Sequence, residues 1–566
     1  MSSSNPIDRR SVLRIGAGAS LGLTAAPFLA ACGDGAPPAK AEAHDSRLLP
    51  TTTLRSDGPR PDLPGTAAGV PQGFYRYPAQ TVRATTGRPL AGADPVKVVM
   101  ETYSPPAAAR SRNAAYQAIE KLLGGTVDVT GVPADDYPTK FSTFVAGGDL
   151  PDVFMYPESG GVDNRAAFLD ATCADLTPFL AGEKVKEYPN LAAIPQSAWQ
   201  TVIFGGKLYG VPIARYGTGG AGVYRHDLFA RAGVTDLDQI TDLDRFVELC
   251  KALTRPDKDE YAISATVGNL VAMSAGAPQS WRVDPKTGKW QHQLETPEFE
   301  QAVEVQRTLY KAGCYYPGTL GMTGTQKAKY TDLFKNGKAA YVYDGMPGYM
   351  TASTGYYDAM RAVDPSYDPR PIRPFGPKAV VWTDNVALSV THFRKSSPER
   401  VRQLLRLADF AASPFGSTEY TLINYGVEGT DFTRDKSGNP ALTGKGTLDA
   451  AVPWKFIASG TPAVFMAAGK NPVDYVHEAY AEMVPMMIAD PTLGYSSPTW
   501  DSKATGSLAT LAGDGIKDII SGRKPVSSYK QLTRDYLAAG GEQARNEFEE
   551  AAQQGKKATS SKGAAK

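Results

Sequence analysis

Polar and aromatic residues directly follow two strands that the sequence predicts. They are Tyr103 with Ser104, after residues 96–100, and Tyr156 with Glu158, after residues 151–155. Open α/β sheets bind ligands at the carboxyl ends of parallel strands, so these four side chains are expected to border one site. An aromatic ring can cover the apolar face of a solute, while hydroxyl and carboxylate groups can bind its hydroxyl groups. This is the combination that binding of a sugar in water requires.

Asp149 is a further candidate for binding a solute. It ends the segment Gly147-Gly148-Asp149, directly before the strand predicted over residues 151–155. A carboxylate in a glycine-flanked turn can reach two neighbouring hydroxyl groups of a ligand. The equally open alternative is an Asx turn, in which the Asp149 side chain binds the backbone of its own turn. Asp152, beside Pro151, is expected to have a structural role.

Signatures of catalysis, metal binding and cofactor binding are weak in this chain. The five histidines form no H-E-x-x-H motif, no Ser-His-Asp set stands out, and the four cysteines are too far apart for a zinc site. The segment Gly217–Gly222 matches G-x-G-x-x-G, but a dinucleotide site needs a helix after the last glycine, and residues 223–225 continue as a strand. We therefore predict no catalytic residue, no metal and no cofactor.

The charge balance argues against binding to polyanions. The chain of 566 residues has 60 Lys and Arg against 59 Asp and Glu, so it has no large positive excess that would attract nucleic acid or anionic lipid. Hydrophobic residues make up 42% of the chain, as in globular proteins, and a chain of this length folds into two or more domains. We expect a folded monomer that binds no nucleic acid.

The first 32 residues have the pattern of an export signal. Paired arginines, Arg9 and Arg10, precede a weakly apolar run over residues 15–31, and the segment Leu29–Gly33 resembles a bacterial lipobox. We expect residues 1–31 to be a twin-arginine-like signal that is removed. Cys32 would then carry a lipid that anchors the protein at the outer face of the cell membrane. An ordinary cleaved signal with an incidental cysteine is the alternative.

Segments of low complexity flank the folded body on both sides. Residues 33–93 contain nine prolines and eight glycines, which is typical of a tether without a core. The aromatic cluster Phe74, Tyr75 and Tyr77 is unusual in a free linker, so we expect the second half of the segment 32–93 to pack on the folded body. Residues 551–566 are rich in Gln, Lys, Ser and Ala and are predicted to be disordered.

Strands and helices alternate from Asp94 onwards. Strands are predicted over residues 96–100, 126–132 and 151–155, with helices between them over residues 114–123 and 137–145, each stopped by a glycine pair. This alternation predicts right-handed βαβ units and a parallel sheet, and hence an α/β protein. Of three later helices, one is expected to be capped by Thr241, and the other two are expected to open at Thr296-Pro297-Glu298 and at Ser397-Pro398-Glu399.

Several segments resemble motifs of the family 1 extracellular solute-binding proteins, in the order in which that family has them. Gly147–Phe154 resembles the family's S/G-G-D-x-P-D-V turn, and Gly206–Pro212 with Val223–Val234 resembles its G-K-L-Y-G-V-P and Y-R-K-D-L-F segments. Three further matching segments are Phe334–Ala340, Asn424–Gly429 and Ala538–Gly541, of which the last two are typical of the longer lipoprotein branch. The resemblance runs from about residue 94 to about residue 550.

This resemblance implies a two-lobed periplasmic-binding-protein fold of type II. Each lobe is then an α/β unit, the ligand cleft lies between the lobes, and crossing segments form the hinge. By analogy, lobe 1 comprises residues 94–215 and 385–430, and lobe 2 comprises residues 223–375 and 455–550. Arg215 and Tyr216 would lie where the chain first crosses between the lobes, which makes both of them candidate ligand residues.

The second lobe contributes three more candidate ligand residues. Asp344 and Tyr349 follow an apolar strand, in a segment where the family often has an aromatic sugar platform. Met346 and Pro347 stand where a Trp is common, so Tyr349 is expected to substitute for it. Trp500 lies in a loop before a helix and is a candidate stacking ring, with a core position as the alternative.

The family implies a receptor rather than an enzyme. Such a protein captures a carbohydrate, here expected to be an oligosaccharide, by closing its lobes, and delivers it to an ABC permease whose partner subunits hydrolyse ATP. Two alternatives remain open. One is a secreted glycan-active enzyme, which needs two carboxylates flanking a glycosidic bond and which 59 acidic residues do not exclude. The other is a receptor of the same fold for a non-sugar solute.

Overall fold

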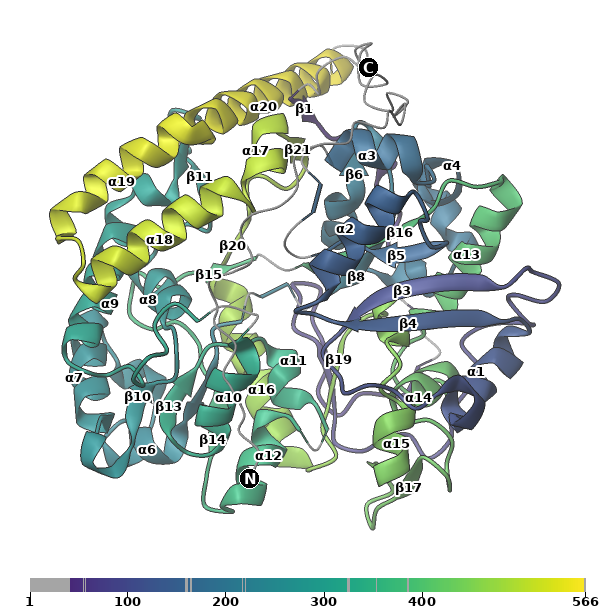
Figure 1. The fold of residues 1–566 in the computed structure, drawn as a ribbon, viewed down its shortest axis with the longest axis horizontal. Helices are drawn as coiled ribbons and strands as arrows, with labels where there is room; N and C mark the ends of the chain where they lie inside the picture. The colour runs from purple at the N-terminus through teal and green to yellow at the C-terminus, as the bar shows by residue number, and fades with distance from the viewer. Residues whose placement is uncertain are drawn as a thin grey trace, which may run out of the picture. The chain divides into compact units, whose positions relative to one another are not determined.

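The computed structural model describes residues 41–563, apart from residues 54, 56–57, 158–160, 163–164, 216, 219, 323–325, 353 and 384–385. The predicted export signal, the predicted lipidation site Cys32 and the candidate ligand residues Glu158 and Tyr216 lie outside the described residues. Two larger sheets, the helices that pack with them and a set of C-terminal helices make up most of the described chain (Figure 1).

The first of these sheets has five strands. In spatial order they are β4 (Val127–Pro133), β3 (Val96–Thr102), β5 (Val153–Met155), β16 (Ala387–Phe393) and β8 (Gly210–Ala214). β3 pairs in parallel with β4 and with β5, as the sequence predicts. β16 is antiparallel to β5 and to β8, so β8 runs in the direction of the first three strands. The carboxyl ends of β3, β4, β5 and β8 therefore share one edge, which we call the C-terminal edge.

The helices between the first strands begin and end where the sequence indicates. α1 (Ala114–Leu123) starts after Asn113, whose side chain accepts a hydrogen bond from the Tyr116 backbone N–H at 2.8 Å. It ends at Gly124, which has a φ of 75° that a residue with a side chain rarely adopts. α2 (Tyr137–Gly147) ends at a second left-handed glycine. Buried side chains of these helices and of β3 and β5 contribute to one continuous core.

The second large sheet has four short strands. In spatial order they are β10 (Tyr261–Ile263), β13 (Ala339–Val342), β9 (Val223–Arg225) and β14 (Pro369–Pro371). β10 and β13 are parallel, whereas β9 is antiparallel to both of its neighbours. The helices that pack with these strands in a second core are α7 (Leu243–Leu253), α8 (Gly268–Ala275) and α9 (Pro297–Lys311).

The helix openings predicted at Thr296 and at Ser397 are confirmed. The hydroxyls of Thr296 and Ser397 accept hydrogen bonds from backbone N–H groups of α9 and of α13 (Pro398–Ala411), at 3.3 Å in both cases. The prediction for Thr241 is wrong, because Asp242 caps α7 and its Oδ1 accepts a hydrogen bond from a backbone N–H of the first turn at 2.8 Å. Asp242 directly precedes the helix, so its short side chain reaches that N–H.

The chain ends in a group of helices. They are α17 (Pro498–Lys503), α18 (Ser507–Ser521), α19 (Tyr529–Tyr536) and α20 (Glu542–Gly563). The prediction of disorder from residue 551 is wrong over residues 551–563, where α20 continues. Phe548 stacks on Trp290 with ring centroids 4.9 Å apart, and Ala551 is fully buried, so packing holds α20 at the point where disorder was expected. Ala, Gln and Lys also favour helix over other conformations.

Part of the segment rich in proline and glycine packs on the folded chain. β2 (Gln72–Phe74) pairs in parallel with β19 (Ala463–Phe465). The ring centroids of Phe74 and Tyr77 lie 4.5 Å and 5.1 Å from that of Phe415. These contacts give a physical reason for an aromatic cluster within a segment whose composition is otherwise that of a tether.

Candidate ligand-binding site

The C-terminal edge of the five-stranded sheet brings together residues from separate parts of the chain. Tyr103 and Ser104 follow β3, Tyr156 follows β5, and Arg215 follows β8. All four are candidates that the sequence predicts. The chain also leaves the sheet at this edge after β8 and returns to it at the start of β16. Carboxyl ends of parallel strands are where sheets of this kind bind ligands, so we place the candidate site here.

Tyr103 presents an aromatic surface at this edge. Half of the residue is exposed (50%), and Ser104 beside it is partly exposed. The Tyr103 hydroxyl donates a hydrogen bond to Glu101 Oε1 at 2.6 Å, and its ring meets the Phe456 ring edge-on with centroids 6.0 Å apart. The ring is therefore held in position while much of its surface remains accessible to a solute.

Tyr156 supports an arginine at this edge. The tyrosine is 8% exposed, and the guanidinium carbon of Arg165 lies 3.8 Å from its ring centroid. Arg165, the first residue of α3 (Arg165–Thr172), also lies 4.4 Å from the ring centroid of Phe204. The Tyr156 ring thus has a cation–π partner within the protein, which leaves it little surface for a solute. The sequence analysis missed Arg165, because no motif marks it.

The Arg165 guanidinium has few hydrogen-bond partners. Its Nη2 lies 3.4 Å from His392 Nε2, and its Nε is buried without a hydrogen-bond partner among the described residues. Burial and, after it, the charge of Arg165 lower the pKa of His392 to about 3, so this imidazole is neutral near pH 7. His392 is therefore a neutral neighbour and contributes no charge beside Arg165.

Two further cations lie near each other at this edge. Residues 455–459 run alongside β8, where Ile213 and Ser459 form a parallel bridge. Desolvation and, after it, the charge of Arg215 lower the pKa of Lys455, although the Lys455 side chain is exposed. The charge of Arg215 is therefore within electrostatic reach of Lys455.

α17 contributes an acidic residue, Asp501, whose carboxyl is affected by the charge of Arg165. Asp501 is exposed, yet desolvation raises the pKa of its carboxyl to about 7, against the opposing effect of the Arg165 charge. Asp501 is therefore within electrostatic reach of an arginine that belongs to the helices of the first sheet. The neighbouring Trp500, a predicted stacking ring, is partly exposed and packs edge-on against Trp281 with centroids 5.5 Å apart. It remains a candidate, with only part of its surface available.

Asp149 lies at the opposite edge of the sheet. It is exposed and connects α2 with the amino end of β5, whereas the other candidates of this sheet follow carboxyl ends. The structure does not bring Asp149 together with those candidates, which removes the support for Asp149 as a ligand residue. Asp152 has the structural role expected of it, since its carboxylate pairs with Arg394 and Arg400 at 3.0 Å each.

Of the two candidates that follow β13, one is hydrogen-bonded within the protein and the other is buried. Asp344 accepts hydrogen bonds from Lys327 Nζ and the Tyr356 hydroxyl, both at 2.7 Å, and from the next backbone N–H at 2.8 Å. Tyr349 is fully buried, and its hydroxyl donates to a carbonyl oxygen of β14 at 3.0 Å. A ring without exposed surface cannot stack on a solute, so the expectation that Tyr349 forms an aromatic platform is wrong for this structure.

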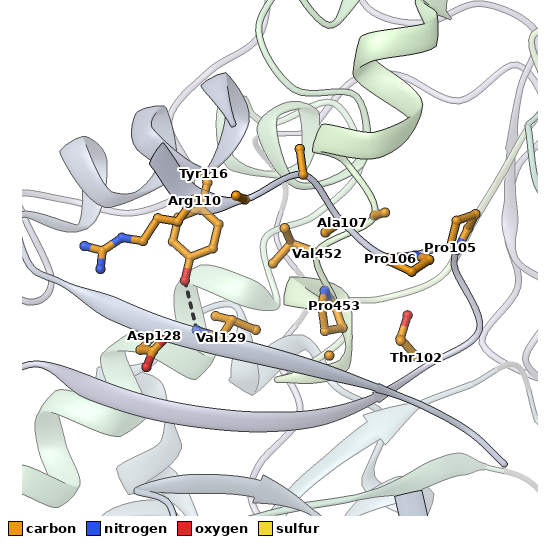
Figure 2. Close-up of a pocket in the computed structure, with 14 residues that line it drawn as sticks. Thr102, Pro105, Pro106, Ala107, Arg110, Tyr116, Asp128, Val129, Val452 and Pro453 are labelled. Carbon is orange, nitrogen blue, oxygen red and sulfur yellow. Dashed lines mark hydrogen bonds between the residues drawn. The ribbon is translucent and has the colours of Figure 1, made fainter. Parts of the chain in front are cut away.

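A pocket of about 360 Å³ lies beside the end of β3 (Figure 2). It is bounded by the segment Pro105–Arg110, by β4 and by residues 451–453. The Arg110 guanidinium pairs with Glu120, and the Tyr116 hydroxyl is hydrogen-bonded to the backbone of β4, as the dashed line in Figure 2 shows. Much of the remaining lining is proline, alanine and valine. Because its charged and hydroxyl groups are already paired within the protein, this pocket offers few free polar groups to a solute, which favours the C-terminal edge as the solute site.

A known family matches more than half of the chain. The model that describes bacterial extracellular solute-binding proteins covers residues 114–419. The chain belongs to this family. This confirms the assignment that the sequence motifs indicate.

Two relatives of this solute-binding protein come from Bacillus subtilis. The polygalacturonan/rhamnogalacturonan-binding protein YtcQ is 24% identical over 468 residues, which are 79% of this chain and 89% of YtcQ. Lipoprotein LipO is 26% identical over 268 residues, which are 44% of this chain and 50% of LipO. Both are distant relatives, and LipO matches over only half of its length.

Solved structures share the fold of this solute-binding protein. The HMO binding ABC-transporter associated solute-binding protein from Bifidobacterium longum infantis aligns with a TM-score of 0.58 and 14% identity, over 81% of this chain and 98% of that one. FusA from Streptococcus pneumoniae in complex with kestose aligns with a TM-score of 0.56 and 14% identity, over 82% and 99%. The two-lobed α/β fold of type II that the sequence predicts is confirmed.

Metal-binding clusters, a dinucleotide-binding turn and membrane-spanning helices do not occur in the described part of this solute-binding protein. There, no group of three or more His, Cys, Asp or Glu side chains could hold a metal ion, and Cys173, Cys250 and Cys314 are buried thiols without a disulfide. The G-x-G-x-x-G segment leads into β9, and α6 (His226–Arg231) begins only after that strand, so the last glycine opens no helix. None of the described helices is both long and apolar enough to traverse a bilayer.

Proposed function

We propose that this protein is the lipid-anchored, extracytoplasmic substrate-binding component of an ABC importer. It captures an oligosaccharide by closing its two lobes and delivers the sugar, chemically unchanged, to a membrane permease whose partner subunits hydrolyse ATP. The observation that carries the sugar assignment is the half-exposed Tyr103 ring at the C-terminal edge. A flat ring covers the apolar face of a sugar, while Ser104 beside it and Arg215 after β8 offer groups for its hydroxyls.

The comparisons support the sugar assignment and the lipid anchor indirectly. YtcQ is named for binding polygalacturonan and rhamnogalacturonan, and FusA was solved with kestose, which is also a carbohydrate. LipO is named a lipoprotein. In this chain the lipobox-like segment Leu29–Gly33 supplies a cysteine at the position that a lipid anchor requires.

Calorimetry and small-angle X-ray scattering together test binding and closure. Purified protein without residues 1–31 is screened against oligosaccharides by isothermal titration calorimetry, and scattering is measured with and without a saturating ligand. We expect a smaller radius of gyration with ligand, because binding energy drives the lobes together. Binding with an unchanged radius would contradict closure. Shorter sugars appearing during the incubation, detected by chromatography, would favour a glycan-active enzyme instead.

Substitution of the predicted lipidation site tests the anchor. Cys32→Ser is expected to move the protein from the membrane fraction of the producing cells into the medium, because two acyl chains are lost. Cys173→Ala, which removes a buried thiol without touching the lipobox, is the matched control and should stay with the membrane. Retention of Cys32→Ser in the membrane fraction would show that another feature holds the protein there.

A further inference from the structure

The first described residues of the chain contact both lobes, which we name the five-stranded and the four-stranded lobe after their sheets. We call residues 41–53 the strap. Its strand β1 (Glu42–Ala43) pairs antiparallel with β21 (Tyr495–Ser496). The backbone N–H of the next residue, His44, donates to the Gly494 carbonyl at 2.7 Å. Backbone hydrogen bonds thus attach the first end of the strap at β21.

β21 packs with elements of the four-stranded lobe. The ring centroids of Tyr495 and Trp290 lie 5.9 Å apart, and Trp290 stacks on Phe548 of α20. Trp290 lies in the chain between α8 and α9, two helices that contribute to the core of the four-stranded sheet. α20 also passes close to β1, because a Cβ atom on Gly555 would lie 3.0 Å from the Ala43 Cβ. The first end of the strap is therefore attached to the four-stranded lobe.

The second end of the strap is attached to the five-stranded lobe. The Leu49 carbonyl accepts a hydrogen bond from the Gly182 N–H at 3.3 Å, and the Thr51 N–H donates to the Gly182 carbonyl at 3.0 Å. The Thr53 N–H donates to the carbonyl of Ala192 at 2.7 Å. Ala192 belongs to the core of the five-stranded sheet, and Leu49 packs against that core. The strap therefore links the two lobes.

The link between the two attachments is short. Only residues 45–48 lie between them, and three of these form the single-turn 3-10 helix η1 (Ser46–Leu48). In this turn the Leu48 N–H donates to the Asp45 carbonyl at 3.0 Å. Even when fully extended, the five steps from residue 44 to residue 49 span about 17 Å at most. The two attachments can move further apart than this only if backbone hydrogen bonds of the strap break.

We propose that the strap limits how far the two lobes separate and thereby raises the affinity for the solute. Neither attachment lies in the β8–β9 connection, through which the chain passes between the lobes, so the strap is a separate link. Wide opening has to unwind η1 or break hydrogen bonds at one end of the strap, which raises the free energy of the open state. The apparent affinity of a protein that closes on its ligand increases with the fraction of molecules in the binding-competent state. The inference goes beyond the proposed function, because it concerns the lobes and not the kind of solute.

Lengthening the strap tests the limit without removing either attachment. About ten Gly and Ser residues are inserted between Ser46 and Arg47, which are both exposed. Small-angle X-ray scattering of the unliganded protein should give a larger radius of gyration than the wild type. Calorimetry with whichever of kestose and oligogalacturonate the wild type binds should show affinity weakened by about 2- to 10-fold. With that sugar at saturation, the two proteins should have the same radius, because the closed state does not stretch the strap.

The matched control receives the same insertion between Ala67 and Ala68. These residues are exposed at the tip of a loop that hydrogen bonds between Leu63 and Gly73 close at its base, so added length there extends no link between the lobes. The control should keep the wild-type affinity within about twofold, and its radius should be the smaller of the two insertion variants. Equal radii in the two insertion variants would overturn the inference. If neither sugar binds, the proposed function loses its support, and the radius of the unliganded protein still decides the inference.

Proline variants release the strap at either end. His44→Pro removes the N–H that donates to the Gly494 carbonyl, and Thr51→Pro removes the N–H that donates to the Gly182 carbonyl. Each variant should enlarge the radius of gyration of the unliganded protein. The double variant should have the same radius as the single variants, because one released end already frees the lobes. Wild-type radii in both single variants, or a further increase in the double variant, would overturn the inference.

Discussion

Residues that follow strands differ between the two sheets in how far they are accessible to a ligand. After β3 and β8 of the five-stranded sheet, Tyr103 is half exposed, and Arg215 forms no ion pair with a described residue. After β13 of the four-stranded sheet, Asp344 is bound by three donors and Tyr349 is fully buried. A polar and an aromatic residue occur in both places. Their position after a strand makes them candidates, and the packing of neighbouring elements decides whether they remain available to a ligand.

Truncating one tyrosine in each region tests this comparison most severely. Tyr349→Ala should lower the free energy of unfolding by about 3–5 kcal/mol, because it opens a cavity in a packed core. Tyr103→Ala should lower it by less than about 1 kcal/mol, since half of this residue is already exposed. Urea unfolding followed by circular dichroism measures both values. Similar losses would show that Tyr103 is as much a core residue as Tyr349.

Truncating an acidic residue in each region is the next test. Asp344→Ala should cost about 1–3 kcal/mol of unfolding free energy, because the Tyr356 hydroxyl that it accepts from is left without its partner. Asp149→Ala, at an exposed turn, is the matched control and should stay within about 0.5 kcal/mol of the wild type. The same urea titrations apply. An unchanged Asp344→Ala variant would mean that its three hydrogen bonds contribute nothing net, and Asp344 would again be a candidate for the ligand.

Variants of Tyr103 also test whether its accessible ring binds the ligand. If the proposed function holds, Tyr103→Ala should weaken oligosaccharide binding by about 3- to 10-fold, which corresponds to ~0.5–1.5 kcal/mol of lost stacking. Tyr103→Phe keeps the ring and should bind within about twofold of the wild type. Isothermal titration calorimetry separates the two. Equal losses in both variants would show that the hydroxyl, rather than the ring face, meets the sugar.

The smallest expected effect concerns the pH dependence of Asp501, because its side chain is exposed and solvent screens much of the effect of its charge on stability. Desolvation raises its pKa to about 7 in the folded protein, above the usual value of 3.8, so the folded state holds this proton more tightly than the unfolded state does. Ionisation of Asp501 therefore reduces stability as the pH rises from about 4 to about 7. Asp501→Asn should match the wild type near pH 4 and be the more stable protein at pH 8, by the urea midpoint. A difference that does not change with pH would contradict the raised pKa.

Local signals in the sequence predicted the elements around the first sheet well. The ranges of α1 and β3 follow from caps, glycine stops and apolar periodicity, which act within a few residues. Asp149 shows the limit of such signals. Its glycine-flanked turn is where the sequence predicts a turn, but the direction of β5 places that turn at the edge away from the other candidates. Arg165 was missed for the same reason, since only the packed structure brings it over the rings of Tyr156 and Phe204.

The sequence by itself determined the α/β alternation, the family and the strand ends at which ligand residues were to be sought. Only the tertiary structure decided which of those residues are available, that Tyr349 is buried and that Asp344 is hydrogen-bonded within the protein. The physical reason is how far apart in the chain the interacting residues are. Backbone hydrogen bonding and periodicity depend on near neighbours in the chain, whereas exposure, desolvation and ion pairing depend on contacts between segments that are far apart in it.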